Sequence, residues 1–344
     1  MSKSVKNFLV RKNIEISAKR YFIDAMSAMA MGLFSSLLVG TILNTIGLKL
    51  NITFLTATVW PACRDMTGAA IGIAIAHALK AHSFVLFSAT IVGFAGNKLG
   101  GPVGAFIATI VSVELGKAVS RETKIDLIVT PMVTIISGTL IATLVGPGMS
   151  SFMTWLGNLI MEATTLQPFW MGVTVSVLVG VVLTLPISSA AICMMLSLAG
   201  LAGGAATVGC AAQMIGFAVM SYRDNGLGGS FAVGIGTSML HMPNIIKNPR
   251  IWIPPTLTAT ILGPLATIVF KMENIPIGSG MGTCGLAGQV GTITAMDAIG
   301  RGGVDTYFAV LLLHFILPAV FSLFFTFILR KINWIKDGDL KLEL

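Results

Sequence analysis

Two long stretches of the chain contain no charged residue, and they constrain the fold more than any other feature. No Lys, Arg, Asp or Glu occurs from Leu127 to Met161 or from Ala163 to Tyr222. Each stretch exceeds the roughly 20 apolar residues that a membrane-spanning helix needs. Backbone groups in lipid must be paired within their own segment, which favours helices, and the alternating pattern of a membrane barrel is absent. We therefore predict an all-α polytopic membrane protein.

The distribution of charge supports this prediction. Only 10% of the 344 residues are charged, whereas a soluble domain keeps about a quarter. The net charge of +8 does not indicate nucleic-acid binding, because much of it precedes the first apolar run. These early basic residues are Lys3, Lys6, Arg11, Lys12, Lys19 and Arg20. They are typical of a cytoplasmic flank, and the apolar stretch 25–48 is too long for a signal peptide. We expect a cytoplasmic N-terminus, contact with the lipid bilayer and no nucleic-acid partner.

The chain carries an internal repeat. Asn97-Lys-Leu-Gly-Gly101 recurs as Asn225-Gly-Leu-Gly-Gly229, and Gly146-Pro-Gly-Met149 corresponds to Gly278-Ser-Gly-Met281. Shorter matches occur in the same order in both halves. Their collinear order predicts a tandem duplication.

The repeat defines five parts of the chain. They are a basic cytoplasmic segment (1–20), a first membrane repeat (21–165), a second membrane repeat (166–300), an extra transmembrane helix (301–330) and a polar tail (331–344). Several apolar segments are too short to span a bilayer alone. We therefore expect about 4–5 membrane segments in each repeat, some broken or re-entrant, and about 9–11 crossings in total. Parallel and inverted repeats both remain open.

The paired glycine turns are the first candidates for binding a solute. They comprise Asn97, Gly100 and Gly101 in the first repeat and Asn225, Gly228 and Gly229 in the second. Adjacent glycines permit a broken backbone, which survives at membrane depth only if it is buried or lines a watery cavity. The alternative is that these glycines only allow helices to pack closely.

A second set of candidates follows the glycine-led segments. Asn158 and Glu162 follow the first of these segments, and Gln289 and Asp297 follow the second. We expect re-entrant hairpins here, with an amide on each. Ionisable groups inside a membrane are costly and are candidates for function. Glu162 and Asp297 can instead be ordinary carboxylates at helix ends.

Other polar residues divide between binding and structural roles. Ser188 and Ser189 provide a polar entry to a short helix, and His241 closes a glycine-rich helix. All three are candidates for lining a pathway, although a lone His is often a packed side chain. Glu114 and Lys117 have the i,i+3 spacing of a local ion pair, and adjacent Arg64 and Asp65 can pair with each other.

No pattern in the chain indicates catalysis. A nucleophile–base arrangement, a phosphate loop and metal-type spacing are all missing, and the four cysteines are far apart. We read the cysteines as small buried hydrophobes. We expect no enzyme activity, no cofactor and no metal.

A resemblance adds to this interpretation. It rests on Gly68-Ala-Ala-Ile-Gly72, Gly96-Asn-Lys-Leu-Gly-Gly-Pro-Val-Gly104, Leu185-Pro-Ile-Ser-Ser189, Asn225-Gly-Leu-Gly-Gly229 and His241-Met-Pro-Asn-Ile245. With these segments the chain resembles the membrane (IIC) component of bacterial phosphoenolpyruvate-dependent sugar phosphotransferase systems, in the divergent branch often labelled putative toxin regulator. The resemblance implies a homodimer in the bacterial inner membrane, with a scaffold part and a moving transport part. Any phosphorylation would require separate soluble phosphotransferase components.

We therefore expect a transporter of a small polar solute, a sugar by resemblance. It would work by alternating access, with the site between the repeats. The alternative is a membrane-bound sensor or regulator that keeps the fold without transport. A channel is disfavoured, because no ring of like charges or filter motif is visible.

Overall fold

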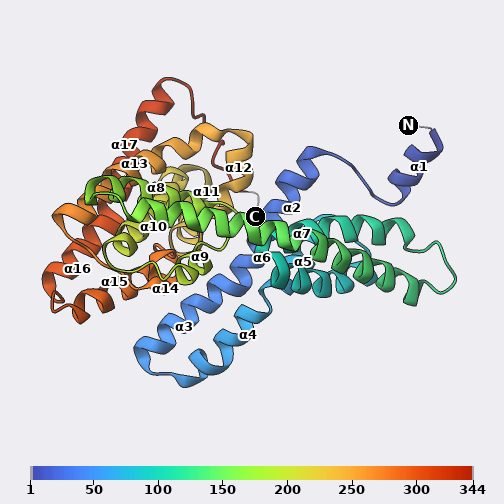
Figure 1. Cartoon of the computed structure of the whole chain (residues 1–344). Coiled ribbons are helices and arrows are strands. Elements are labelled where there is room, and N and C mark those ends of the chain that lie inside the picture. The colour runs from blue at the N-terminus through green and yellow to red at the C-terminus, as the bar shows by residue number, and fades with distance from the viewer. Residues whose placement is uncertain (1–2, 343–344) are drawn as a thin grey trace. The chain divides into compact units, whose positions relative to one another are not determined.

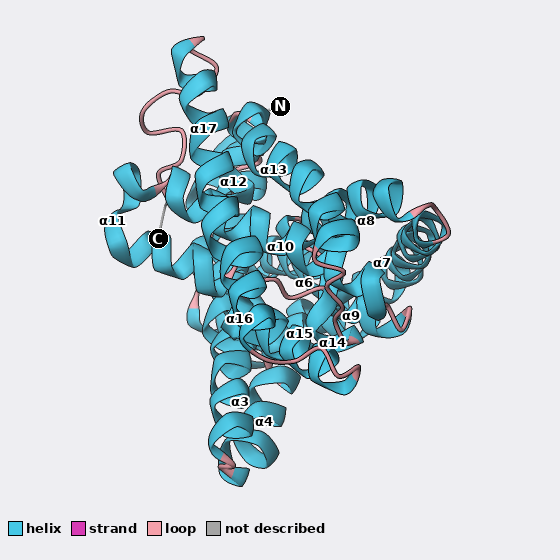
Figure 2. Ribbon diagram, turned by 90° about the vertical axis from the view of Figure 1, so that its left-hand side faces the viewer, coloured by secondary structure: helices cyan, strands magenta, loops and turns pink. Residues whose placement is uncertain are grey.

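The computed structural model describes residues 3–342, and its secondary structure is helical apart from one isolated β-bridge between Gly200 and Asn274 (Figures 1 and 2). Among these described residues, six helical stretches are long and apolar enough to cross a membrane: Arg20–Leu48, Ser83–Val119, Asp126–Thr164, Gly200–Met220, Pro249–Val269 and Val304–Lys331. Two shorter apolar helices accompany them, Thr67–Ala78 and Pro168–Thr184. The prediction of an all-α polytopic membrane protein is confirmed.

The chain divides into two compact units. Unit 1 contains Met1–Leu37 and Pro61–Phe152, and unit 2 contains Leu38–Trp60 and Met153–Glu343. These units differ from the predicted repeats, 21–165 and 166–300. Spatial grouping does not test a duplication that rests on sequence similarity, so the repeats stay a prediction.

Unit 1 is a helical bundle. Its helical elements are α1 (Lys3–Arg11), η1 (Arg20–Asp24), α2 (Ala25–Leu33), most of η2 (Phe34–Leu38), most of α4 (Trp60–Asp65), α5 (Thr67–Ala78), α6 (Ser83–Val119) and the first part of α7 (Asp126–Thr164). Helix α5 lies between α2 and α6. An added Cβ at Gly72 of α5 would overlap the carbonyl oxygen of Ala89 in α6. Small residues of this kind let helix backbones approach closely in membranes.

Helix α6 is a hairpin of two arms. The backbone leaves helical geometry at Gly100 and at Gly101, where φ is 62° and ψ is −163°. The arms then pack on each other, because a Cβ at Gly96 would lie 2.7 Å from Cα of Ala105. Gly116 and Val85 are likewise neighbours. The predicted helices at about 83–96 and 102–119 are these two arms, so both ends of α6 lie at the same end of unit 1.

Basic side chains gather at that end. Arg20 donates to the carbonyl oxygen of Leu79 at 2.7 Å, and Lys117 donates to the same oxygen at 3.0 Å. Leu79 ends α5, and cations are favoured at helix C-termini. Lys117 also pairs with Glu114 at 2.9 Å, which confirms the predicted i,i+3 ion pair. The predicted pairing of Arg64 with Asp65 is confirmed as well, at 3.0 Å.

A second contact lies where α6 ends. Lys12 donates to the carbonyl oxygen of Ser120 and pairs with Glu122, which Arg11 also contacts at 2.8 Å. The hydrogen bond from Lys12 lowers the pKa of the Glu122 carboxyl, and the charge of Arg11 adds to this effect. The N-terminal segment is thereby fastened to the C-termini of α5 and α6.

Helix α7 corrects one expectation. It runs from Asp126 to Thr164 without a break, through Gly146, Pro147 and Gly148. The re-entrant hairpin predicted at Gly146–Met149 is therefore absent. A proline is tolerated inside a membrane helix, because neighbouring groups and small adjustments compensate for its missing hydrogen bond.

Unit 2 contains more and shorter helices. They are α3 (Val39–Leu50), η3 (Leu55–Val59), the end of α7, α8 (Pro168–Thr184), α9 (Ser189–Met195), α10 (Gly200–Met220), α11 (Tyr222–Phe231), η4 (Ala232–Gly236), η5 (Ser238–His241), α12 (Met242–Lys247), η6 (Pro249–Trp252), α13 (Ile253–Pro264), η7 (Leu265–Val269), α14 (Pro276–Ser279), η8 (Cys284–Leu286), α15 (Ala287–Ala298), α16 (Val304–Leu311), η9 (Leu312–Ile316) and α17 (Leu317–Lys331). Helix α10 is the central element, packed against α8, α13 and α17. A Cβ at its Gly209 would overlap the carbonyl oxygen of Ser176 in α8.

The second glycine motif also turns the chain. In α11, Gly226 has φ 63° and ψ −165°, nearly the values of Gly101 in unit 1. The chain then returns along α10, since a Cβ at Gly234 would lie 3.2 Å from Cβ of Ala218. The turning glycine is the fifth residue of the first motif but the second residue of the second motif.

Candidate functional site

One face of α10 is covered by broken segments of unit 2. Thr207, Cys210, Met214 and Phe217 follow each other at helical spacing and share this face. In the same order, these side chains contact Asn274, Gly282, Thr283 and His241. A buried helix face lined by irregular backbone is where a membrane protein can expose unpaired main-chain groups to a solute.

Asn274 is the most heavily bonded side chain of this region. It is 1% exposed and lies just before α14, the short helix that begins at Pro276. Its amide nitrogen donates to the Thr207 hydroxyl at 2.5 Å and to the Gly288 carbonyl at 3.0 Å, and its oxygen accepts from the backbone N–H of Ile275 at 2.7 Å. One neutral side chain thus joins α10, α14 and the start of α15.

The 276–289 segment is broken at the place where a re-entrant hairpin was predicted for the second half. Helices α14 and α15 pack together, and the backbone between them has positive φ at Gly282, Gly285 and Leu286. The hydroxyl of Thr283, in this turn, donates to the carbonyl of Gly234 in η4. The turn is therefore tied to the segment that follows α11.

Of the two predicted serines, Ser189 contacts the same segment. Ser188 begins α9 and accepts from the N–H of Ala191 at 3.3 Å. Ser189 is buried and donates to the carbonyl of Gly280 at 2.6 Å. The beginning of α9 and the end of α14 consequently meet in unit 2.

Gln289 lies on α15 and faces the last membrane helix. Its side-chain nitrogen lies 3.1 Å from Nδ1 of His314, and both residues are buried. Three polar atoms remain without a hydrogen-bond partner among the described residues: Oε1 of Gln289, Nε2 of His314 and Oγ1 of the neighbouring Thr292. Groups like these are normally satisfied by water or a ligand.

His241 is fully buried and stacks on Phe217, with ring centroids 5.0 Å apart. Neither ring nitrogen has a partner in the described part of the chain. Close to Phe217 on α10, the amide of Gln213 accepts from Trp252 at 3.0 Å and donates to Thr256 at 3.2 Å. Aromatic rings beside amides are suited to holding polar solutes with apolar faces.

The other predicted residues lie elsewhere. Asn97 is half-buried in the first arm of α6 and packs against Gly68 of α5, and Gly100 and Gly101 form the turn of that helix. Asn225 makes two hydrogen bonds with the C-terminal tail. Its side-chain nitrogen donates to the carbonyl of Leu340 at 2.7 Å, and its side-chain oxygen accepts from the N–H of Leu342 at 2.8 Å. Gly228 is exposed, and Gly229 is buried against Asn225.

The predicted carboxylates and Asn158 are exposed. Asn158 and Glu162 lie on the last part of α7, and Asp297 lies near the end of α15 beside Gly302. Ser189 therefore contacts the 280–289 turn of unit 2, and Gln289 lies at the end of that turn. Asn158, Glu162 and Asp297 do not lie at this turn.

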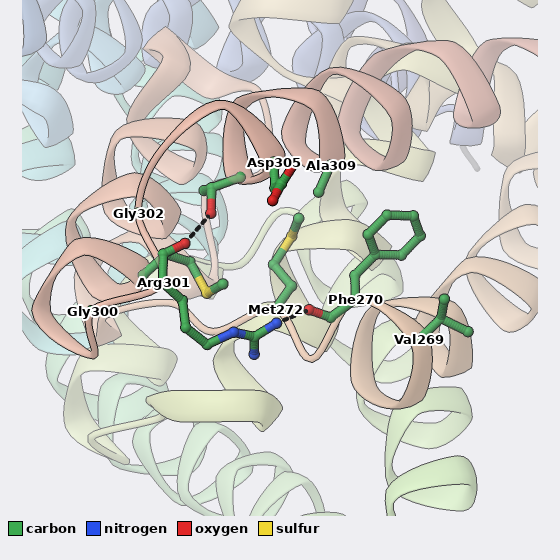
Figure 3. Close-up of a pocket in the computed structure, with 10 residues that line it drawn as sticks. Val269, Phe270, Met272, Gly300, Arg301, Gly302, Asp305 and Ala309 are labelled. Atoms are coloured by element: carbon green, nitrogen blue, oxygen red, sulfur yellow. Dashed lines mark hydrogen bonds between the residues drawn. The ribbon is translucent and has the colours of Figure 1, made fainter.

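A hollow of about 380 Å³ lies where η7 ends and α16 begins (Figure 3). Arg301 donates to the carbonyls of Phe270 and Lys271, at 3.0 Å each, and so caps the end of η7. Asp305 lines the hollow from the first turn of α16. None of the lining residues was predicted from the sequence.

Two buried residues of unit 2 were missed by the sequence analysis: Asn274 and Gln213. A signal was present for Asn274, since an Asn followed two residues later by Pro often initiates a turn or helix. Gln213 lies inside the apolar helix α10, where only the packing of other elements distinguishes it.

The comparison with known proteins agrees with this architecture. The family described as "Phosphotransferase system, EIIC" matches residues 23–342. The chain belongs to this family. It is therefore a membrane permease component of the phosphotransferase type, embedded in the bacterial plasma membrane and not catalytic by itself. No curated protein and no solved structure matches the chain.

Proposed function

We propose that this permease moves a neutral, hydroxyl-rich solute of the sugar class, and that unit 2 carries the solute. The observation that carries the proposal is the face of α10 against the 274–289 segment. It is lined by neutral amides and hydroxyls, of Asn274, Thr207 and Thr283, and by irregular backbone. Such groups can exchange their mutual hydrogen bonds for bonds to a polyol without burying a charge.

Serine, glutamine and histidine side chains complete the proposed site. Ser188 and Ser189 begin α9 beside the end of α14, and Gln289 begins the arm that follows the turn. His241 supplies two hydrogen-bonding nitrogens next to an aromatic ring. Breaking and remaking the bonds that join these short helices provides a motion for alternating access.

The proposal also assigns roles to unit 1, to the soluble partner proteins and to a second copy of the chain. Unit 1 serves as the scaffold, with its basic end in the cytoplasm, as expected from the positive-inside rule. Separate soluble components of the phosphotransferase system would phosphorylate the solute, and the working form would be a homodimer.

Counterflow in proteoliposomes tests the proposal. The purified protein is reconstituted, and labelled hexoses, hexitols and disaccharides are each offered against an internal load of the same compound. We expect at least one compound to exchange, and we expect Asn274→Ala and Gln289→Ala to abolish that exchange. Thr294→Ala on α15 is the matched control, because Thr294 is exposed and bonds only within its own helix.

Each result has a defined meaning. Exchange that survives Asn274→Ala would place the site elsewhere, and Asn97→Ala and Asn225→Ala would then test the glycine turns. Saturable binding of a compound without exchange would favour a sensor or regulator and refute transport. If protein with a normal thermal unfolding transition neither binds nor exchanges any of the compounds, the sugar class is refuted.

A further inference from the structure

Three buried polar side chains of unit 2 keep hydrogen-bonding atoms that no other group uses. Gln289 and Thr292 lie three residues apart on α15, so they share one face of that helix. His314 lies on η9, and α15 packs against α16, the helix that leads into η9 (Figure 2). Gln289 is 6% exposed, and Thr292 and His314 are 0% exposed. All three side chains are therefore out of contact with bulk solvent.

The contact between Gln289 and His314 uses only part of each group. The side-chain nitrogen of Gln289 donates to Nδ1 of His314 at 3.1 Å, which places the ring hydrogen on Nε2. Oε1 of Gln289 is then a free acceptor and the Nε2–H of His314 a free donor, because neither atom has a partner within residues 3–342. Turning the amide over exchanges the two roles and leaves the same combination, one donor and one acceptor.

The hydroxyl of Thr292 differs from those of other buried threonines in unit 2. Thr207 and Thr258 donate to the carbonyl four residues earlier in their helices. The carbonyl four residues before Thr292 is that of Gly288, which already accepts from Asn274 at 3.0 Å. Oγ1 of Thr292 has no partner in the described part of the chain. This hydroxyl is therefore available to a group outside its own helix.

His314 lies in an irregular segment with apolar neighbours. The segment, Leu312–Ile316, is a π-helix between α16 and α17, and such segments occur frequently at functional sites. The adjacent Leu313 belongs to an apolar cluster with Val208 and Val310. Apolar side chains offer no hydrogen bond, so three polar atoms left unpaired beside them would destabilise the fold. A polar group that bonds them removes this cost.

We propose that Gln289, Thr292 and His314 form an internal binding site for a hydroxyl group, supplied by a water molecule or by the solute. A hydroxyl group both donates and accepts, which matches a free acceptor, a free donor and a second hydroxyl. A buried water molecule typically makes about three hydrogen bonds. The solute as source rests on the proposed transport of a sugar, whereas the water molecule does not. The extra helix at 301–330, outside both predicted repeats, supplies one wall of this site.

The direction of a stability change tests the site. Thr292→Val exchanges the hydroxyl for a methyl group of similar size in the full-length protein, and thermal unfolding is measured without sugar, in a detergent that has no sugar headgroup. If a water molecule bridges the three side chains, valine removes one of its partners, and we expect the midpoint to fall by about 2 °C or more. Thr294→Val is the matched control, because Thr294 is exposed and bonds within its own helix, and its midpoint should stay close to wild type.

A hydroxyl group of the solute gives a different result. Without solute the Thr292 hydroxyl is then unpaired, so Thr292→Val raises the midpoint, and the affinity for a sugar that exchanges in counterflow falls about tenfold or more. A midpoint that does not fall, with no loss of affinity for any tested compound, overturns the site. The stability measurement needs no solute, so failure of the transport proposal is recognised separately, by the absence of counterflow.

Histidine spectroscopy checks the site independently of stability. The chain has four histidines, so protein labelled with ¹⁵N at histidine gives few ring signals, and His314→Gln identifies those of His314. Spectra are recorded with the exchanged sugar present wherever counterflow has found one. We expect Thr292→Val to shift the Nε2 signal of His314, because both groups contact one hydroxyl, and Thr294→Val to leave it in place. An Nε2 signal that is the same in wild type and in both variants overturns the shared site, whatever the midpoints.

Discussion

The two units bury different kinds of polar groups. In the described residues, the buried cations Lys12, Arg20 and Lys117 all belong to unit 1, and the buried amides and imidazoles all belong to unit 2. Those of unit 2 are Gln213, Asn244, Asn274, Gln289, His241 and His314. The cations of unit 1 lie at helix C-termini, where charge stabilises the bundle. Two of the neutral groups of unit 2, Asn274 and His241, lie beside helix breaks, and both belong to the proposed solute site.

The glycine turns show what the units share. Gly101 and Gly226 have backbone angles within a few degrees of each other, in a region of φ and ψ that is essentially restricted to glycine. Both turns connect helix arms that pack side by side. The units therefore use one turning device but surround it with different chemistry.

The sharpest way to break the comparison is to remove a cation from unit 1. Lys117→Met leaves Glu114, whose side chain is 14% exposed, without its ion-pair partner. We expect a loss of about 3–5 kcal/mol of unfolding free energy, as for other half-broken buried pairs. Denaturant titration in mixed micelles measures this loss. The double variant Lys117→Met with Glu114→Gln should recover most of it, and failure to recover would show that the ion pair is not the reason.

Alanine at the turning glycines tests the shared device. Gly101→Ala and Gly226→Ala force a side chain into a strained conformation, and each should cost about 1–3 kcal/mol. Gly148→Ala in unit 1 and Gly228→Ala in unit 2 are the controls, because neither glycine has a positive φ and an added Cβ would meet no atom within 4 Å, so each should cost well under about 1 kcal/mol. Thermal unfolding measures all four. A large cost in one unit alone would show that the two turns are not equivalent.

The smallest expected effect is a change in the stability of unit 1 with pH. Because the pKa of Glu122 is lowered in the folded protein, its carboxylate stabilises the fold fully at pH values above the ordinary glutamate pKa of about 4.3. This stabilisation is lost as the pH falls through the lowered folded-state pKa. The difference in thermal midpoint between wild type and Glu122→Gln should therefore shrink from pH 7 towards pH 3. A difference that stays constant with pH would exclude the Lys12–Glu122 contact as its source.

Local rules predicted part of this fold. The helices at about 83–96 and 102–119 and the break at Gly100-Gly101 follow from hydrophobic runs and from glycine chemistry, which are local properties. The continuity of α7 through Gly146-Pro147-Gly148 does not, because it depends on neighbours that compensate for the proline. Only the second glycine-led segment is broken there, although both carry the same Gly-x-Gly-Met spacing.

The candidate site was harder to predict for the same reason. Ser189 was identified as part of a polar entry to a short helix and Gln289 from its position after a glycine-led segment, and both are buried in unit 2. Asn225 was expected to face a solute, yet its amide bonds residues more than a hundred positions later in the chain. Asn274 was missed because its importance comes from Thr207 and Gly288, which only tertiary packing brings to it.

The backbone contacts of the tail have a consequence for how its sequence can change. The side chains of Asp224 and Asn225 bond main-chain atoms of Gly338, Leu340 and Leu342, so most substitutions at exposed positions such as Lys341 leave these bonds in place. An insertion of one residue before Leu340 is different, because it shifts the phase of every later side chain. It would carry Leu340 to the exposed position of Lys341 and put the inserted residue in the buried one. Length, more than composition, is therefore what the end of this chain must keep constant.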